Sequence, residues 1–242
     1  FNVNLEFDRH KVNGIIQDTI ENNGKGYVCS IESNNLTVAN NNIAFNHVVN
    51  NALVNICDGS VLALLLGKIH GKNFNAFIGA DLFTEYVHKR KYRQYFLGNT
   101  QEVLSGLKNN LSQIDPKIQE MSFVELPFRK VEEFDYKAIA EDINKDNPDI
   151  IWVSLGAPKQ EFFMSHLLPY LNRGVMFGFG AIFNFNAGIG NVKRAPLWMR
   201  RMKLEWLYRA MEEPQKNIPR YYNFLTILPK LILSERKLVQ RK

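Results

Sequence analysis

The chain has 242 residues, 45% of them hydrophobic, which is enough for a large buried core in one domain or in one domain with an appendage. No run of about 18 apolar residues lacks charge, so we expect no transmembrane helix, and the first residues show no signal-peptide pattern. Two cysteines, Cys29 and Cys57, are too few for a disulfide framework and lack metal-site spacing, which favours a reducing compartment.

The net charge of +6 is concentrated near one end of the chain. Residues 190–242 contain 13 Lys/Arg and 4 Glu, whereas residues 1–189 contain 17 Lys/Arg and 20 Asp/Glu. A near-neutral body with a strongly basic tail predicts an anionic partner for the tail: a phosphate group, a nucleic acid or an acidic membrane surface.

Short apolar runs alternate with helical patterns along the first 190 residues. In chain order, we predict strands at 5–7, 27–33, 53–57, 75–79, 94–98, 120–126, 149–156 and 174–180. Between them, segments 10–24, 60–71, 100–114, 135–147 and 160–172 have helical periodicity and are closed by Gly, Asn or Pro. This alternation predicts an α/β domain over 1–190 with a mainly parallel, helix-covered sheet, followed by a basic helical appendage over 191–242.

Ligands of such sheets bind beyond the carboxyl ends of the strands, so the residues that follow each strand are candidates for a site. Glycines there let a ligand approach the backbone, and helix N-termini favour anions, which indicates a nucleotide or a phosphosugar. The candidates are Ser30, Glu32, Asp58, Gly59, Gly79, Ala80, Asp81, Gly98, Asn99, residues 156–161, Gly178, Gly180 and Asn184.

Two of these motifs allow two interpretations each. In "ICDGS", Asp58 could accept a proton from a sugar hydroxyl, or it could cap the helix that begins at Ser60. In "SLGAPKQE", Lys159 and Gln160 could stand at a phosphate-binding helix N-terminus, or they could face solvent in an ordinary turn. Position alone leaves both alternatives open.

Several nucleotide and metal motifs are absent from the sequence. "GFGAIFNF" lacks the third glycine of a dinucleotide fingerprint, and there is no phosphate-binding P-loop and no nucleophile elbow. No D-x-D pair occurs and the five histidines are scattered, so we expect no metal site and no cofactor.

The tail combines charge with apolar residues on every side. In residues 192–216, Lys and Arg alternate with Trp, Met and Leu, and a helix that is apolar on more than one side needs more than one apolar partner. We expect one partner to be the body and the other an anionic bilayer. The residues expected to supply the bilayer contact are Tyr221, Tyr222, Phe224, Leu225, Ile227, Leu228, Leu231, Ile232 and Leu233.

Seven motifs taken in order resemble the WecG/TagA/CpsF glycosyltransferases: "ICDGS", "FIGADLF", "YFLGN", "SLGAPKQE", "GFGAIFNFNAG", "VKRAP" and "LEWLYRAMEEP". The resemblance extends from about Val3 to Arg220. It implies a Rossmann-like fold of the GT-E type and an inverting, metal-independent transfer of a sugar from a UDP donor to an undecaprenyl-diphosphate-linked acceptor. It also implies a peripheral position on the cytoplasmic face of the bacterial inner membrane, in the synthesis of teichoic acid, capsule or exopolysaccharide.

The resemblance also implies roles for individual residues. Asp58 matches the general base, and Gln160 matches a residue important for activity. With the strand-end positions, the candidates for the UDP donor are Gly79, Asp81, Gly98, Gly156, Lys159, Glu161, Gly180, Arg209, Lys216 and Arg220. The candidates for the sugar or the acceptor are Ser30, Glu32, Asn184, Lys193 and Arg194.

Two departures from the family pattern affect sugar specificity. Ser30 and Glu32 stand where the family commonly has Thr-x-Asn, and Asn184 replaces an Asp. N-acetylmannosamine is the default donor sugar that the resemblance implies, and because of these two departures glucose, galactose or a related hexose stay as alternatives. A nucleic-acid-binding module and a non-catalytic membrane scaffold are the competing classes. We expect no nucleic-acid partner, since no reader motif occurs, and the sequence leaves a homo-oligomer open.

Overall fold

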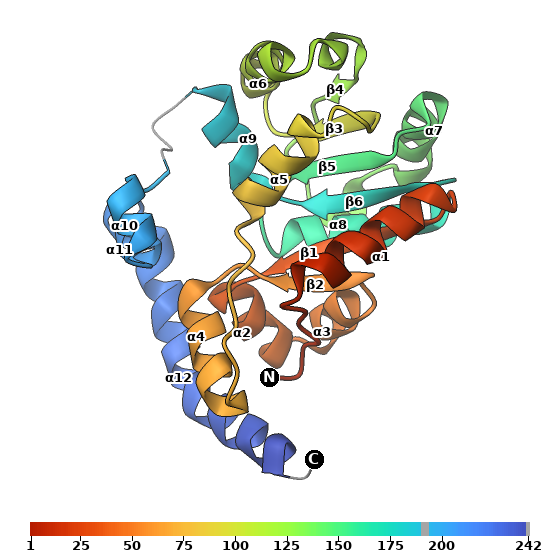
Figure 1. Ribbon diagram of the computed structural model, residues 1–242. Helices are drawn as coiled ribbons and strands as arrows, with labels where there is room; N and C mark the ends of the chain where they lie inside the picture. Colours follow the sequence, from red (N-terminus) through yellow and green to blue (C-terminus); the bar gives the residue numbers. More distant parts are fainter. Residues whose placement is uncertain (190–193, 241–242) are drawn as a thin grey trace.

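The computed structural model describes residues 1–189 and 194–240, which form an open six-stranded sheet with helices on both faces (Figure 1). The strand order is β2-β1-β6-β5-β3-β4, and every neighbouring pair is parallel. The strands are β1 (Lys25–Ile31), β2 (Val54–Cys57), β3 (Gln94–Gly98), β4 (Phe123–Val124), β5 (Ile150–Ser154) and β6 (Gly174–Gly178). The predicted α/β class with a parallel, helix-covered sheet is confirmed.

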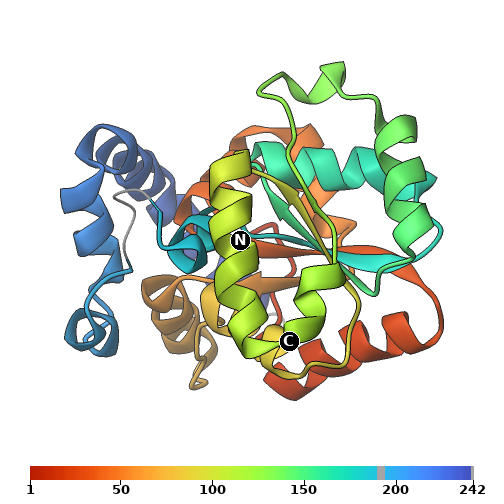
Figure 2. The same ribbon diagram turned by 90° about the horizontal axis from the view of Figure 1, so that it is seen from above.

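Successive side chains of each strand enter two different cores, because strand side chains alternate between the faces of a sheet. In β5, Trp152 packs into the first core and Val153 into the second. Helices α1 (Arg9–Glu21), α5 (Gly79–His88), α6 (Gln101–Ile114) and α9 (Gly180–Ala187) cover the first core. Helices α2 (Ser33–Asn41), α3 (Ile43–Asn50), α4 (Ser60–His70), α7 (Tyr136–Asp146) and α8 (Lys159–Leu167) cover the second, on the opposite face (Figure 2). Short 3-10 turns occupy Pro116–Glu120, Val131–Glu133 and Leu168–Tyr170.

Two predicted strands are wrong. Residues 5–7 form only an isolated parallel bridge between Glu6 and Ile56, and residues 75–79 have no regular strand structure before α5 begins at Gly79. Both segments lie against β2: the Glu6 amide donates to the Asn55 carbonyl at 2.9 Å, and the Phe77 amide donates to the Cys57 carbonyl at 2.7 Å. Phe77 is buried in this way, and the other apolar residues of the two segments are partly buried.

Four helices were not predicted: α2, α3, α5 and α9. The sequence of α2 and α3 is rich in Asn, which has weak helix propensity, and a local cap starts α3, where the Asn42 side chain accepts from the Phe45 amide. Helices α5 and α9 each begin at a glycine that the apolar pattern placed at the end of a strand.

The C-terminal appendage has three helices, α10 (Leu197–Arg201), α11 (Glu205–Glu212) and the long α12 (Pro214–Gln240). Helix α12 packs on α2 and α4, and it buries Phe224 and Leu231 in the second core. Its far part is joined to α4 by a hydrogen bond of 2.8 Å between Glu235 Oε1 and His70 Nε2. The predicted boundary at 190/191 lies outside the described residues.

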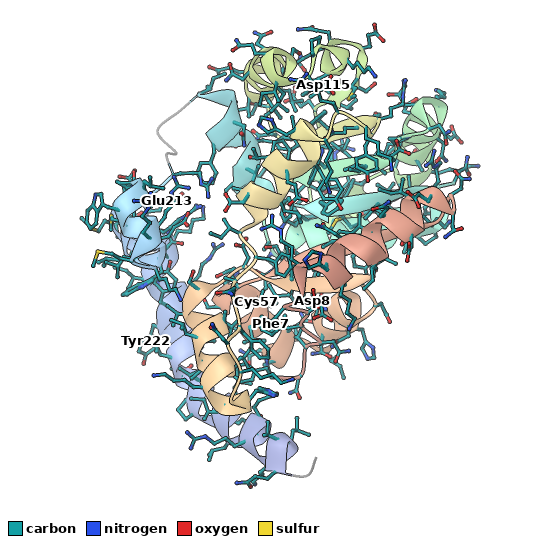
Figure 3. All side chains as sticks on the ribbon, viewed as in Figure 1. Phe7, Asp8, Cys57, Asp115, Glu213 and Tyr222 are labelled. Carbon is teal, nitrogen blue, oxygen red and sulfur yellow. The ribbon has the colours of Figure 1, made fainter. Side chains whose placement is uncertain are left out.

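This packing corrects the expected bilayer contact. Phe224, Ile227, Leu228 and Leu231 pack on the body. Other apolar side chains of the appendage remain exposed, and Figure 3 shows Tyr222 pointing away from the body. We call seven of them the outer apolar surface: Trp198, Met202, Met211, Ile218, Tyr222, Leu225 and Leu233. Within residues 1–189 and 194–240, no helix is both long and apolar enough to span a bilayer.

Candidate active site

A cleft with a volume of about 1050 Å³ lies at the carboxyl edge of the sheet. In Figure 1 the appendage helices stand beside this edge, and residues of α11 and α12 line the cleft together with residues that follow β1, β2, β3, β5 and β6. The body and the appendage therefore each supply part of one site.

Asp58 lies partly buried on the floor of this cleft, directly after β2. Its Oδ2 accepts a hydrogen bond of 2.8 Å from the Ser30 hydroxyl, and its Oδ1 accepts one of 3.3 Å from the Gly79 amide. Burial raises the pKa of Asp58 to about 7, the two hydrogen bonds oppose this shift, and the carboxylates of Glu205 and Glu32 add to it. Helix α4 has no side-chain cap bond, so the interpretation of Asp58 as its cap is wrong.

A raised pKa suits Asp58 to proton transfer. A carboxylate with a pKa near the working pH is a stronger base than one of ordinary pKa, yet it is still substantially ionised at neutral pH. Asp58 is therefore a candidate for a base in the cleft.

Behind the cleft, Glu161 is fully buried and holds two polar side chains that line the cleft. Its Oε1 accepts hydrogen bonds from Asn35 Nδ2 at 2.9 Å and from Gln160 Nε2 at 3.1 Å, and Gln160 Nε2 also donates to the Gly178 carbonyl at 2.8 Å. Burial raises the pKa of Glu161 to about 7, which these donors oppose. The orientation of the Gln160 amide is thus fixed from below by β6 and Glu161.

A second group of polar side chains, centred on Asn99, lines the cleft. Asn99, with φ of +68°, donates from Nδ2 to Asn184 Oδ1 at 2.6 Å and to Ser154 Oγ at 3.2 Å. The Ser154 hydroxyl donates to the Gly180 carbonyl at 2.8 Å. Asn tolerates positive φ better than most residues, so the sharp turn after β3 can carry a side chain that joins three neighbouring elements.

Cationic side chains surround the mouth of the cleft. Arg209 on α11 lies over the Phe185 ring of α9, with its guanidinium carbon 4.9 Å from the ring centroid, and this contact joins the appendage to the body. Lys216 pairs with Glu213 at 3.0 Å, and Arg194 pairs with Asp81 at 3.2 Å. These cations can receive an anionic ligand.

Lys159 also lines the cleft, on the side away from the appendage. Its Nζ lies 5.1 Å from the Phe128 ring centroid and 5.2 Å from that of Phe134. The two rings hold the cation in place without neutralising its charge.

The structure brings most of the predicted site residues together. Those that line the cleft are Ser30, Glu32, Asp58, Gly156, Lys159, Gln160, Gly180, Asn184, Arg194, Arg209, Lys216 and Arg220. Lys193 lies outside the described residues.

Four predicted residues do not line the cleft. Asp81 is exposed and pairs with Arg194, Glu161 is buried behind Gln160, and Gly79 supplies only its amide to Asp58. Gly98 is required by packing, since its φ is +98° and a Cβ there would approach the Ser154 carbonyl oxygen to 2.6 Å. These residues support the site without facing a ligand.

Sequence reasoning missed several residues of the cleft. Ser154 and Asn35 were not candidates, because Ser154 is the last residue of an otherwise apolar strand and Asn35 lies on an unpredicted helix. Phe128, Glu205, Trp206 and Asn217 also line the cleft. Tyr221, which was expected to face the bilayer, lines it as well, and its hydroxyl donates to the Trp206 carbonyl at 3.1 Å. In the part of the chain that the structure describes, His, Cys, Asp and Glu form no group of three suited to a metal.

The carboxyl edge of an open parallel sheet thus carries a cleft lined by a carboxylate of raised pKa and by several cationic side chains. This is the arrangement of an α/β protein that can bind an anionic ligand. The model of the family described as "Glycosyl transferase WecG/TagA/CpsF family" matches residues 2–242, and the chain belongs to this family. The resemblance that the seven motifs predicted is confirmed.

Curated relatives include three that carry the same name, N-acetylglucosaminyldiphosphoundecaprenol N-acetyl-beta-D-mannosaminyltransferase. The chain is 30% identical to that of Bacillus subtilis (strain 168) over 179 residues, which is 71% of this chain and 66% of the relative. It is 32% identical to that of Bacillus spizizenii over 170 residues (65% and 62%), and 26% identical to that of Staphylococcus aureus (strain MW2) over 206 residues (82% and 76%). The matched part spans slightly less than two thirds of either Bacillus relative.

Proposed function

We propose that this chain is an inverting glycosyltransferase that moves N-acetylmannosamine from a UDP donor to an undecaprenyl-diphosphate-linked N-acetylglucosamine. Family membership and the names of the relatives support the substrates. The single observation that carries the reaction is Asp58, a carboxylate of raised pKa at the floor of a cleft rimmed by cations.

In this reaction, the Asp58 carboxylate removes the proton of the acceptor hydroxyl while the oxygen of that hydroxyl attacks the anomeric carbon of the donor sugar. The bond between that carbon and the UDP oxygen breaks, and UDP leaves with the bonding electron pair. Attack on the face opposite to UDP inverts the configuration of the anomeric carbon. Such a base contributes about 10²–10⁴-fold to the rate.

The leaving UDP gains negative charge, which preorganised donors stabilise. Arg209 and Arg220 line the cleft from the appendage, and Lys159 lines it from the start of α8. These groups support our proposal that the transfer needs no metal ion.

The acceptor is a lipid, so we propose that the enzyme works as a peripheral protein on the cytoplasmic face of the inner membrane. The outer apolar surface combines Trp and Tyr with Met, Ile and Leu, the composition of an interfacial segment. Lys and Arg near an anionic leaflet contribute about 1 kcal/mol each.

The experiment that tests the function compares Asp58→Asn with Asp18→Asn, which alters an exposed carboxylate on α1 outside the cleft. We expect Asp58→Asn to lower kcat at least 100-fold while the Kd for UDP changes less than twofold, and Asp18→Asn to behave as the unmodified chain. Near-normal turnover of Asp58→Asn would overturn the assignment of the base.

A panel of UDP-sugars tests the donor. Glu32 lies in the cleft close enough to Asp58 to affect its pKa, so a carboxylate faces the region where the sugar reacts. Faster transfer of glucose or galactose than of N-acetylmannosamine would replace the proposed donor.

A further inference from the structure

The lining of the cleft changes from polar to apolar along one direction, from the floor towards the lower part of α12. On one side, Asp58 is followed by Gly59, Ser60 and then Val61 in the first turn of α4. On the opposite side, Tyr221 is followed along α12 by the cleft-lining residues Phe224, Leu225 and Leu228. The part of the cleft between α4 and α12 is therefore apolar on both walls.

Two residues of this apolar part are also open to solvent. Val61 is 51% exposed and Leu225 is 60% exposed, although both line the cleft. Leu64, one turn after Val61 on α4, is exposed as well. Helices α4 and α12 contact each other and lie side by side in Figure 1, so these exposed side chains lie at a mouth of the cleft on the surface where the two helices meet.

This mouth is continuous with the outer apolar surface. Leu225 belongs to both, and Tyr222 and Ile218 precede it at spacings of three and four residues, which places them on one side of α12. An apolar path thus leads from the surface that we propose to face the bilayer into the cleft.

The distance from Asp58 to the start of the apolar walls suits an acceptor made of a sugar, a diphosphate and a lipid. Val61 follows Asp58 by three residues, so their Cα atoms lie at most roughly 10 Å apart. A sugar whose hydroxyl contacts Asp58 therefore has its lipid-linked diphosphate near the start of the apolar walls.

We propose that the polyprenyl chain of the acceptor leaves the cleft over the surface where α4 and α12 meet, across Val61 and Leu225. This inference rests on the proposed function, and it names the part of the cleft that receives the lipid rather than the sugar. The chain's first isoprene units contact Val61 and Leu225, and the rest continues along the outer apolar surface into the bilayer.

The test measures transfer in detergent micelles with two acceptors that share one head group, N-acetylglucosamine diphosphate, and carry either an undecaprenyl chain or a methyl group, which has no isoprene unit. The variants are Val61→Gln and Leu225→Gln. The control is Leu238→Gln, which changes a side chain on α12 that is as exposed as Val61 but does not line the cleft. All three side chains are at least half exposed, so the substitutions leave the fold intact.

We expect either cleft variant to raise the KM for the undecaprenyl acceptor about tenfold, the loss of one apolar side-chain contact of about 1.4 kcal/mol. The KM for the donor, the kcat at saturation and the KM for the methyl acceptor should change less than twofold. Equal effects on both acceptors, no effect on either, or the same effect from Leu238→Gln would overturn the proposal.

A second measurement separates this inference from the proposed function. If the unmodified chain transfers sugar to neither acceptor, the proposed function fails. Crosslinking by an undecaprenyl diphosphate that carries a photoreactive group then tests independently whether the lipid chain contacts α4 and α12. Crosslinks within residues 60–71 and 214–240 that are weakened in Leu225→Gln support the path. Crosslinks confined to other segments, or a change of oligomeric state in Leu225→Gln that shows these residues to be covered by a second copy, would refute it.

Discussion

Removing the Ser30 hydroxyl should shift the pH dependence of transfer towards higher pH. The hydroxyl donates to Asp58 Oδ2 at 2.8 Å and stabilises the ionised form, so Ser30→Ala raises the pKa of Asp58 further above its ordinary value. A hydrogen bond to a charged group contributes about 1.5–3 kcal/mol, and one pKa unit corresponds to about 1.4 kcal/mol. Since the Gly79 amide remains and water replaces part of the loss, we expect a shift of about one unit.

The profile of kcat/KM shifts towards higher pH because we propose Asp58 as a base. The base must be ionised, so kcat/KM falls as pH drops through the pKa of Asp58, which is about 7 in the unmodified chain. In Ser30→Ala this fall should be centred about one unit higher, near pH 8. At pH 7 the ionised fraction then drops from about one half to about one tenth, and kcat/KM drops about fivefold, while the plateau at high pH is retained.

The assay is the pH profile of kcat/KM for the donor between about pH 5 and 9. Glu161 provides the control, because burial also raises its pKa to about 7 but it does not line the cleft. Glu161→Gln should leave the acid side of the profile in place. If the acid side of the profile moves in Glu161→Gln and stays fixed in Ser30→Ala, Asp58 is not the group that sets it.

Three further predictions follow from the geometry of the site. Gly79→Ala places a Cβ 2.9 Å from a Phe179 ring carbon and 3.2 Å from Asp58 Oδ2. This substitution should lower kcat about tenfold without weakening UDP binding. An unchanged kcat would show that the contact of Asp58 with residue 79 does not position its carboxylate. Transfer should persist in EDTA because the cationic side chains of the cleft meet the charge on UDP, whereas loss in EDTA with recovery in Mg²⁺ or Mn²⁺ would contradict it. Tyr222→Ser should weaken binding to anionic vesicles several-fold, with Leu238→Gln as the control, and equal binding of both variants would show that the outer apolar surface does not face the bilayer.

The sequence predicted the body of the fold well because its central strands are continuous apolar runs with distinct boundaries. It failed for α5 and α9, since a glycine after an apolar run is equally compatible with the end of a strand and the start of a helix. The sequence also could not show which of Phe224 and Leu225 is buried. They are neighbours in an apolar segment, but Phe224 is buried on the body and Leu225 is exposed. Only the position of α12 against α2 and α4 decides which side of the helix is covered.

Site residues were predicted where they directly follow a strand or belong to a family motif, as Asp58 and Gln160 do. Ser154 was missed because it ends a strand whose other residues are apolar, so its hydroxyl carried no signal. The supporting role of Glu161 depends on long-range contact with Asn35, which lies 126 residues earlier in the chain. Such contacts are set by topology rather than by local pattern.

Helix α12 is packed on α4, and α4 begins two residues after Asp58. If the outer apolar surface rests on a bilayer as we propose, this packing gives the whole molecule one tilt and holds Asp58, the proposed base, at one height above the head groups. The proposed acceptor is confined to the same bilayer, so enzyme and acceptor would meet by lateral diffusion in two dimensions, with their relative orientation already set.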